Sequence, residues 1–154
     1  MNKMSRNLLY CLVTSMSLIA LLASGCANQG SDRGMEVTFE QLLSNPNQYN
    51  GKQITIEGFV FLGFEVIVLS EELQYSGYDK GHLIPSGTML WIEGGIPTDI
   101  HDELYEQHMM GPSERYGKVL IKGIFQYGGQ YGHLGAYEYQ ITYSEIQLLT
   151  WSPP

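Results

Sequence analysis

Cysteine is almost missing from this 154-residue chain, which contains only Cys11 and Cys26. Cys11 lies within an apolar stretch near the N-terminus that we expect to be removed, which would leave Cys26 as the single thiol. One thiol permits neither an intramolecular disulfide nor a cysteine-ligated metal site. The folded part must therefore be stabilised by its apolar core, and the roughly 115 residues from residue 36 onward are enough to form one.

Basic residues are also scarce, with 8 Lys and Arg against 16 Asp and Glu and a net charge of −8 at pH 7. Lys3 and Arg6 precede the apolar stretch, and removing these two positive charges would take the net charge to −10. Proteins that bind nucleic acid carry a basic patch, and anionic lipid headgroups attract basic segments. We therefore expect no nucleic-acid partner and no electrostatic attraction to lipid headgroups.

Catalytic motifs are absent as well: the chain has no serine nucleophile elbow, no H-E-x-x-H pair and no phosphate-binding loop. Neighbouring acids do occur, at Glu71-Glu72 and Asp102-Glu103, but chance explains such pairs in a chain with 16 acidic residues. The sequence therefore predicts a protein that is not an enzyme and has no catalytic residues, no cofactor and no metal.

The first 25 residues have the three parts of an export signal. Lys3 and Arg6 come first, Leu8–Ala23 is an uncharged and almost wholly apolar run, and small residues then lead to Cys26. The run has 16 residues, fewer than the roughly 20 that a membrane-spanning helix needs. We expect residues 1–25 to be a signal peptide, and the alternative is an uncleaved N-terminal membrane helix.

The end of this segment, Leu22-Ala23-Ser24-Gly25-Cys26, resembles the lipobox of bacterial lipoproteins, although Ala23 stands where Leu is usual. The resemblance implies that Cys26 carries several acyl chains such as palmitate, which together hold a protein firmly on a membrane. We therefore expect a lipid-anchored protein of the cell envelope, outside the cytoplasm. A secreted protein with a leftover cysteine is the alternative.

Residues 26–35 are polar and rich in small side chains, which is typical of a flexible tether. Residues 36–152 then form the predicted domain, which begins with a short helix. Thr38 and Gln41 have the spacing of a capping box, and Val37 can pack on Leu42 as a hydrophobic staple. Asn45-Pro46 is expected to end this helix, because the residue before a proline avoids helical geometry.

The rest of the chain alternates between apolar and polar residues over five segments, which predicts strands. The predicted strands are Gln53–Phe64, Glu65–Ser70, Thr88–Glu93, Lys118–Tyr127 and Ala136–Leu149. Residues 71–86 and 128–132 are expected to be loops, and a second helix from Thr98 or Asp99 to about Met109 separates the third and fourth strands. The order β-β-β-α-β-β is that of a small five-stranded OB-like barrel. Another small barrel or a sandwich is the alternative.

Two glycine-bounded strand starts support the barrel, since Gly51 to Gly58 and Gly117 to Gly123 have the same pattern. First and fourth strands pair in OB barrels, and each needs a glycine, at a bulge or bend, where it coils sharply. The stretch Leu42-Leu43-x-Asn45-Pro46-x-x-Tyr49-x-Gly51-Lys52 also resembles the start of exported bacterial OB-fold families. That resemblance implies the fold and the location but no activity.

Aromatic residues gather around the last predicted hairpin and suggest a binding face. The candidate ligand-binding residues are Tyr127, Tyr131, His133, Tyr137, Tyr139 and Trp91. By alternation, Tyr137 and Tyr139 share one face of the last strand. Tyrosines with few neighbouring bases suit a protein or a saccharide partner, although tyrosine is also a common strand residue. We predict a non-catalytic binding module that contacts an envelope protein or saccharide.

The histidines provide an alternative, in which the lipoprotein carries a metal or haem. His101 and His108 lie seven residues apart on the predicted helix, near one face, and imidazoles suit copper or zinc. His133-x-x-x-Tyr137 is similar to the His-x-x-x-Tyr of OB-fold haem chaperones of cytochrome c maturation. Those proteins carry the motif after the barrel, whereas here it enters the fifth strand, and His108 is expected to be partly packed.

Overall fold

The computed structural model of the protein describes residues 34–108 and 111–154, which belong to one compact unit. The predicted signal peptide, Cys26 and most of the predicted tether lie outside the described residues. The last residue assigned to the tether, Met35, begins strand β1 (Met35–Val37), which pairs in parallel with the segment Ile54–Ile56. In the part that the structure describes, no helix is long and apolar enough to cross a membrane.

The predicted first helix is α2 (Phe39–Ser44), and its capping box is confirmed. The Gln41 amide donates to the Thr38 hydroxyl at 3.2 Å, and the Thr38 amide donates to the Gln41 side chain at 3.0 Å. Pro46 ends this helix as expected but also begins a second one, α3 (Pro46–Tyr49). The fixed φ of proline suits a first helical turn, where no amide donor is needed.

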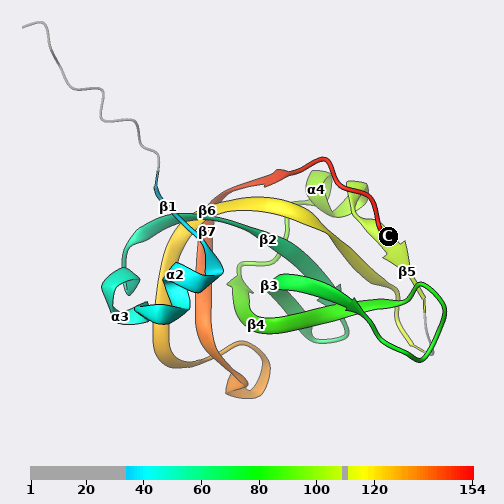
Figure 1. Cartoon of the computed structure of the whole chain (residues 1–154), viewed down its shortest axis with the longest axis horizontal. Helices are drawn as coiled ribbons and strands as arrows, with labels where there is room; N and C mark the ends of the chain where they lie inside the picture. The colour runs from blue at the N-terminus through cyan, green and yellow to red at the C-terminus, as the bar shows by residue number, and fades with distance from the viewer. Residues whose placement is uncertain (1–33, 109–110) are drawn as a thin grey trace, which may run out of the picture. The chain divides into compact units, whose positions relative to one another are not determined.

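The domain is mainly β, with one mixed sheet of seven strands in the order β1-β2-β3-β4-β7-β6-β5 (Figure 1). The remaining elements are β2 (Gln53–Gly63), β3 (Val66–Tyr75), β4 (Leu83–Glu93), α4 (Thr98–Glu103), β5 (Tyr105–Gln107), β6 (Glu114–Tyr131), the 3-10 turn η1 (His133–Gly135) and β7 (Tyr137–Leu148). Because β2 also pairs with β6, five of these strands follow one another in a partial ring. The expected five-stranded barrel is thus corrected: the short strands β1 and β5 extend the sheet.

The antiparallel pairing of β2 with β6 confirms that the first and fourth predicted strands are neighbours. Their register runs without a break through the pair Gly58 and Val119, so of the expected bulge or bend, the bulge is wrong for this pairing. Gly58 is needed for another reason. A Cβ there would lie 2.8 Å from the Ser70 carbonyl oxygen and 3.0 Å from the Phe39 ring. Because glycine has no Cβ, α2 can approach the sheet closely at this point.

The loop predicted over residues 71–86 is wrong. Strand β3 continues to Tyr75 and β4 begins at Leu83, which leaves only residues 76–82 between them. A register irregularity between Ser70 and Glu72 interrupts the pairing of these strands. An extra residue in a strand reverses the alternation of side chains beyond it, which explains why the pattern predicted that the strand ends at Ser70.

The second helix is also shorter than expected, because α4 begins at Thr98 after Pro97 and ends at Glu103 rather than near Met109. Leu104 is buried and contacts Gly117, where a Cβ would lie 2.7 Å from the leucine side chain. The chain then becomes extended and forms β5, which pairs antiparallel with the start of β6. Residues 105–107 therefore pair with the free edge of β6 instead of continuing the predicted helix.

Two apolar cores lie on opposite faces of the sheet. The main core fills the ring and includes Val60, Leu69 and Leu90, together with the helix residue Leu42. The second core lies on the other face, where strand register places Tyr116, Phe61, Val68 and Trp91 in one row across β6, β2, β3 and β4. Directly paired residues point to the same face of a sheet. The C-terminal residues, red in Figure 1, run beyond β7 towards α4 and β5.

Candidate functional site at two linked turns

The predicted aromatic face divides between the two cores. Trp91 and Tyr137 pack together with ring centroids 5.5 Å apart and belong to the second core. Tyr127 and Tyr139 are cross-strand partners with rings stacked at 5.3 Å, and they pack against the main core. The expectation that Tyr137 and Tyr139 share one binding face is therefore wrong. The pairing of β6 with β7 is irregular between Tyr127 and Tyr131, which separates the two pairs.

These rings serve mainly as packing surfaces. Burial raises the pKa of the Tyr137 phenol, and burial together with the charge of Glu138 raises the pKa of the Tyr139 phenol. Gly132 lies directly over the Trp91–Tyr137 pair, since a Cβ there would be 2.6 Å from the indole and 2.7 Å from the Tyr137 ring. Gly132 thus covers part of both rings and reduces the surface available for stacking on a ligand.

His133 is the exposed member of the predicted set, and its imidazole has a partner that the sequence did not suggest. Its Nε2 atom lies 3.1 Å from the Glu65 carboxylate. Glu65 belongs to the segment Gly63–Glu65, which consists of the last residue of β2 and the turn that leads to β3, whereas His133 begins η1 between β6 and β7. The ion pair therefore joins two turns that are far apart in the sequence. We call these two segments, Gly63–Glu65 and His133–Gly135, the linked turns.

Each linked turn contains a residue with a strained backbone. Glu65 has φ 57° and Leu134 has φ 55°, and in the described part of the chain no other non-glycine residue has a positive φ. An L-residue in this left-handed region costs roughly 1–2 kcal/mol. Such strain persists only where the surrounding structure imposes it, and it gathers at functional sites. Its occurrence in both turns marks them as a candidate site.

Both turns also expose a large apolar side chain. Leu134 is 90% exposed and Phe64 is 69% exposed, and each is the direct sequence neighbour of a member of the ion pair. The sequence pattern places Phe64 near the expected binding face, but it did not indicate Glu65 or Leu134 as site residues. A signal was available in bulky apolar residues at positions where a chain reverses direction, since turns normally carry Gly, Asn or Asp.

The two histidines proposed as a metal pair are not aligned on one helix as expected, although both lie near Glu106. A hydrogen bond from Ser113 lowers the pKa of the Glu106 carboxyl most, and the charges of the two histidines lower it further. His101 lies in α4, with Nδ1 3.1 Å from Asp102, and His108 lies beyond β5, with Nε2 3.5 Å from Glu106. Because the helix ends at Glu103, the helical spacing that was to align the two imidazoles does not exist. His108 is exposed rather than packed. Within residues 34–108 and 111–154, no group of three His, Cys, Asp or Glu residues is placed to hold a metal ion.

The proposed haem pair also has other partners, since the His133 imidazole contacts Glu65 and the Tyr137 ring contacts Trp91.

Comparison with known proteins adds little to this geometry. No protein-family model matches the chain, and no curated protein matches it significantly in sequence. A solved structure similar to it is a DUF3299 family protein from Pseudomonas aeruginosa, with a TM-score of 0.39 and 14% sequence identity. The match covers 68% of this chain and 66% of that protein, just under two thirds of its length. This similarity is too low to assign a fold or a function to the chain.

Proposed function

We propose that this protein is a membrane-anchored lipoprotein of the cell envelope whose β domain is a non-catalytic binding module. In this proposal the linked turns bind a partner protein. The observation that carries it is the exposure of Phe64 and Leu134 on two strained turns that lie together, as the 3.1 Å contact between His133 and Glu65 shows.

The strand order supports an OB-like assignment for this module. Strands β2, β3, β4, β6 and β7 have the predicted order, α4 lies between the third and fourth of them, and β2 pairs with β6. OB barrels bind ligands with strands two and three and with the loops between strands one and two and between strands four and five. In this chain those loops contain Gly63–Glu65 and His133–Gly135, the linked turns.

The exposed groups favour a protein over a saccharide. Sugars commonly stack on several aromatic faces, but Trp91 and Tyr137 pack on each other and against Gly132, so Phe64 is the one well-exposed aromatic ring of the linked turns. The most exposed large side chain at the site, Leu134, is aliphatic and has no group to pair with hydroxyls. Exposed apolar side chains with a polar rim are typical of protein interfaces.

Crosslinking in living cells tests the interaction. A photoreactive amino acid at Leu134 should capture one defined partner, and Phe64→Ser in the same protein should reduce the yield at least tenfold. The matched control places the same group at Met35, which is 46% exposed but lies in β1. Equal crosslinking from both positions, or no loss with Phe64→Ser, would contradict a site at the linked turns.

Membrane attachment is tested separately through Cys26. We expect the Cys26→Ser protein to move from the membrane fraction to the soluble fraction, because lipidation requires the thiol. Its circular dichroism spectrum should match that of the wild-type domain. If Cys26→Ser protein stays in the membrane fraction, the N-terminal segment holds it there without lipid, as an uncleaved helix would.

A further inference from the structure

The last residues of the chain cover the second core without being part of the sheet. The Leu149 amide donates to the Lys118 carbonyl at 2.8 Å. Beyond it come residues 150–154, Thr-Trp-Ser-Pro-Pro, which we call the C-terminal segment. Within the described chain this segment forms no backbone-to-backbone hydrogen bond. Its position therefore depends on side chains of the surface beneath it.

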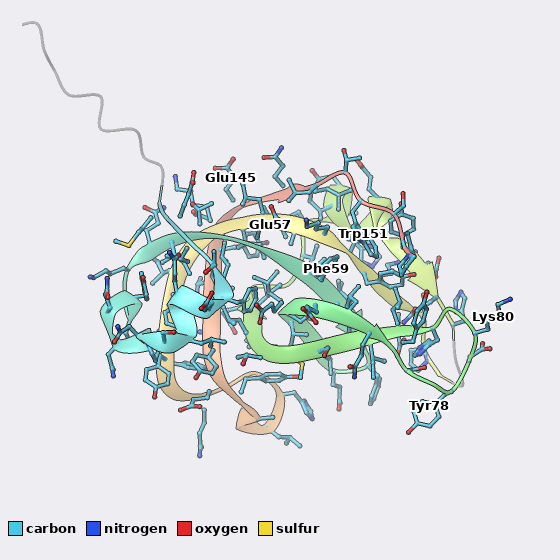
Figure 2. All side chains as sticks on the ribbon, in the orientation of Figure 1. Glu57, Phe59, Tyr78, Lys80, Glu145 and Trp151 are labelled. Atoms are coloured by element: carbon cyan, nitrogen blue, oxygen red, sulfur yellow. The ribbon has the colours of Figure 1, made fainter. Side chains whose placement is uncertain are left out.

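One tryptophan anchors the segment. The Trp151 ring meets Phe59, Tyr105 and Tyr116 edge to face, at centroid distances of 5.1, 5.8 and 6.1 Å. Figure 2 labels Trp151 beside Phe59, on the side of the domain opposite α2 and α3. These rings come from β2, β5 and β6, so the anchor lies in an aromatic groove built by several strands. Edge-to-face contacts stabilise such a ring beyond the burial of its surface.

Two tyrosine hydroxyls hold the backbone of the segment. Tyr105 donates to the Trp151 carbonyl at 2.8 Å, and Tyr75 donates to the Pro154 carbonyl at 3.2 Å. Proline has no amide hydrogen, so an extended proline-containing chain presents carbonyls that need donors. Aromatic grooves that recognise proline-rich peptides have this chemistry.

Three clefts border the segment and are not filled by it. One of about 290 Å³ is lined by Phe59, Leu73 and Leu83, and one of about 280 Å³ is lined by Leu104 and Tyr105. The third, of about 620 Å³, lies at Pro154 and the residues of the β3–β4 loop. A longer or bulkier segment in the same groove would have additional surface to contact.

We propose that this groove is a peptide-binding site for an extended segment of a partner protein that contains proline and a tryptophan-like anchor. In this proposal the chain's own C-terminal segment occupies the site and must be displaced. The partner is another protein rather than a second copy. A tethered segment is present at a high effective concentration, and an identical segment has no extra contacts with which to outcompete it. The site is separate from the linked turns and does not depend on their function.

A synthetic peptide with the sequence of residues 148–154 tests the groove. We expect the full chain with Trp151→Ala to bind this labelled peptide at least tenfold more tightly than the wild-type chain, as measured by fluorescence anisotropy. In the variant the tethered competitor has lost its anchor, whereas the added peptide keeps it. A peptide with alanine in place of the tryptophan should not bind. Equal binding to both proteins, or none to a folded Trp151→Ala protein, overturns the proposal.

A second measurement on the wild-type chain covers the case in which Trp151→Ala does not fold. The chain has two tryptophans, Trp91 and Trp151, so fluorine-labelled tryptophan gives one signal for each. Excess peptide should shift the Trp151 signal towards that of a solvent-exposed ring and leave the Trp91 signal unchanged. No change in the Trp151 signal at about 10 mM peptide, the range of effective concentration for a short tether, overturns the proposal in that case.

Two further comparisons distinguish the possible occupants. Tyr105→Phe, which removes only the hydroxyl bonded to Trp151, should raise the displaced fraction of Trp151. Tyr127→Phe should not, because Tyr127 stacks on Tyr139 and packs against the main core rather than against the groove. Equal effects of the two variants count against the groove. A chain that exchanges this segment with a second copy has twice the expected mass in solution. Such a dimer would overturn the assignment to a partner protein.

Discussion

At the scale of single residues, glycines decide where the chain can pass close to a ring. Gly132 has φ 69° and lies against Trp91 and Tyr137, whereas Gly95 has φ 80° and has no heavy atom within 4 Å of a Cβ position. Both positions therefore have a positive φ, which favours glycine, but only Gly132 also lacks space for a Cβ. The two effects can be separated by making the same substitution at both glycines.

We expect Gly132→Ala to lower the free energy of unfolding by about 2–6 kcal/mol, from backbone strain of about 1–3 kcal/mol at φ 69° and ψ −163° and overpacking of about 1–3 kcal/mol. Gly95→Ala should cost only the strain of a positive φ, about 1–2 kcal/mol. Urea unfolding followed by tryptophan fluorescence measures both values. Equal losses of unfolding free energy for the two variants would show that the Trp91 and Tyr137 rings move aside to accommodate a methyl group.

At the scale of secondary-structure elements, one side chain from β5 holds the end of the β3–β4 hairpin. Gln107 accepts a hydrogen bond from the Leu83 amide at 3.0 Å and donates to the Leu83 carbonyl at 2.6 Å. It also donates to Glu114 at 2.8 Å, and Glu114 contacts the buried His82 at 2.8 Å. The amide side chain thus takes the place of a neighbouring strand for Leu83, which is 2% exposed.

Replacing Gln107 should loosen the hairpin. We expect Gln107→Ala to cost about 2–3 kcal/mol, because it leaves the buried amide and carbonyl of Leu83 without partners. Hydrogen exchange at the Leu83 amide should become faster in the same variant. Gln74→Ala is the matched control, because Gln74 bonds only Ser86 on the exposed side of the hairpin. If the Leu83 amide stayed as protected as in wild type, the bond to Gln107 would not be what holds it.

At the scale of the whole molecule, the partly buried tyrosine phenols in the two cores make the stability of the domain depend on pH. Burial raises the pKa of Tyr116, Tyr137 and Tyr139 above that of a free tyrosine, which is about 10. A group whose pKa is raised by folding stabilises the folded state below its unfolded pKa. That contribution is lost as the pH rises through the folded pKa. The domain should therefore lose stability above about pH 10.

Removing two of these phenols tests the alkaline response. We expect Tyr137→Phe with Tyr139→Phe to reduce the fall in urea midpoint between about pH 9 and pH 11, the range around the tyrosine pKa. Tyr78→Phe should leave the slope unchanged, because Tyr78 is 83% exposed. An unchanged slope in the double variant would assign the alkaline loss to other groups.

The sequence by itself predicted the features that depend on near neighbours in the chain, such as the capping box at Thr38 and Gln41 and the end of α2 before Pro46. It also predicted one long-range feature, the pairing of β2 with β6, from the matched glycine-bounded patterns of the two strands. Contacts between distant segments decided the rest. The register irregularity near Glu71 reverses the side-chain alternation, so the alternation did not predict the second half of β3. Residues 105–107 form a strand because they pair with β6, and His133 contacts Glu65 across two turns. Such contacts form only when the sheet closes, so no local pattern reports them.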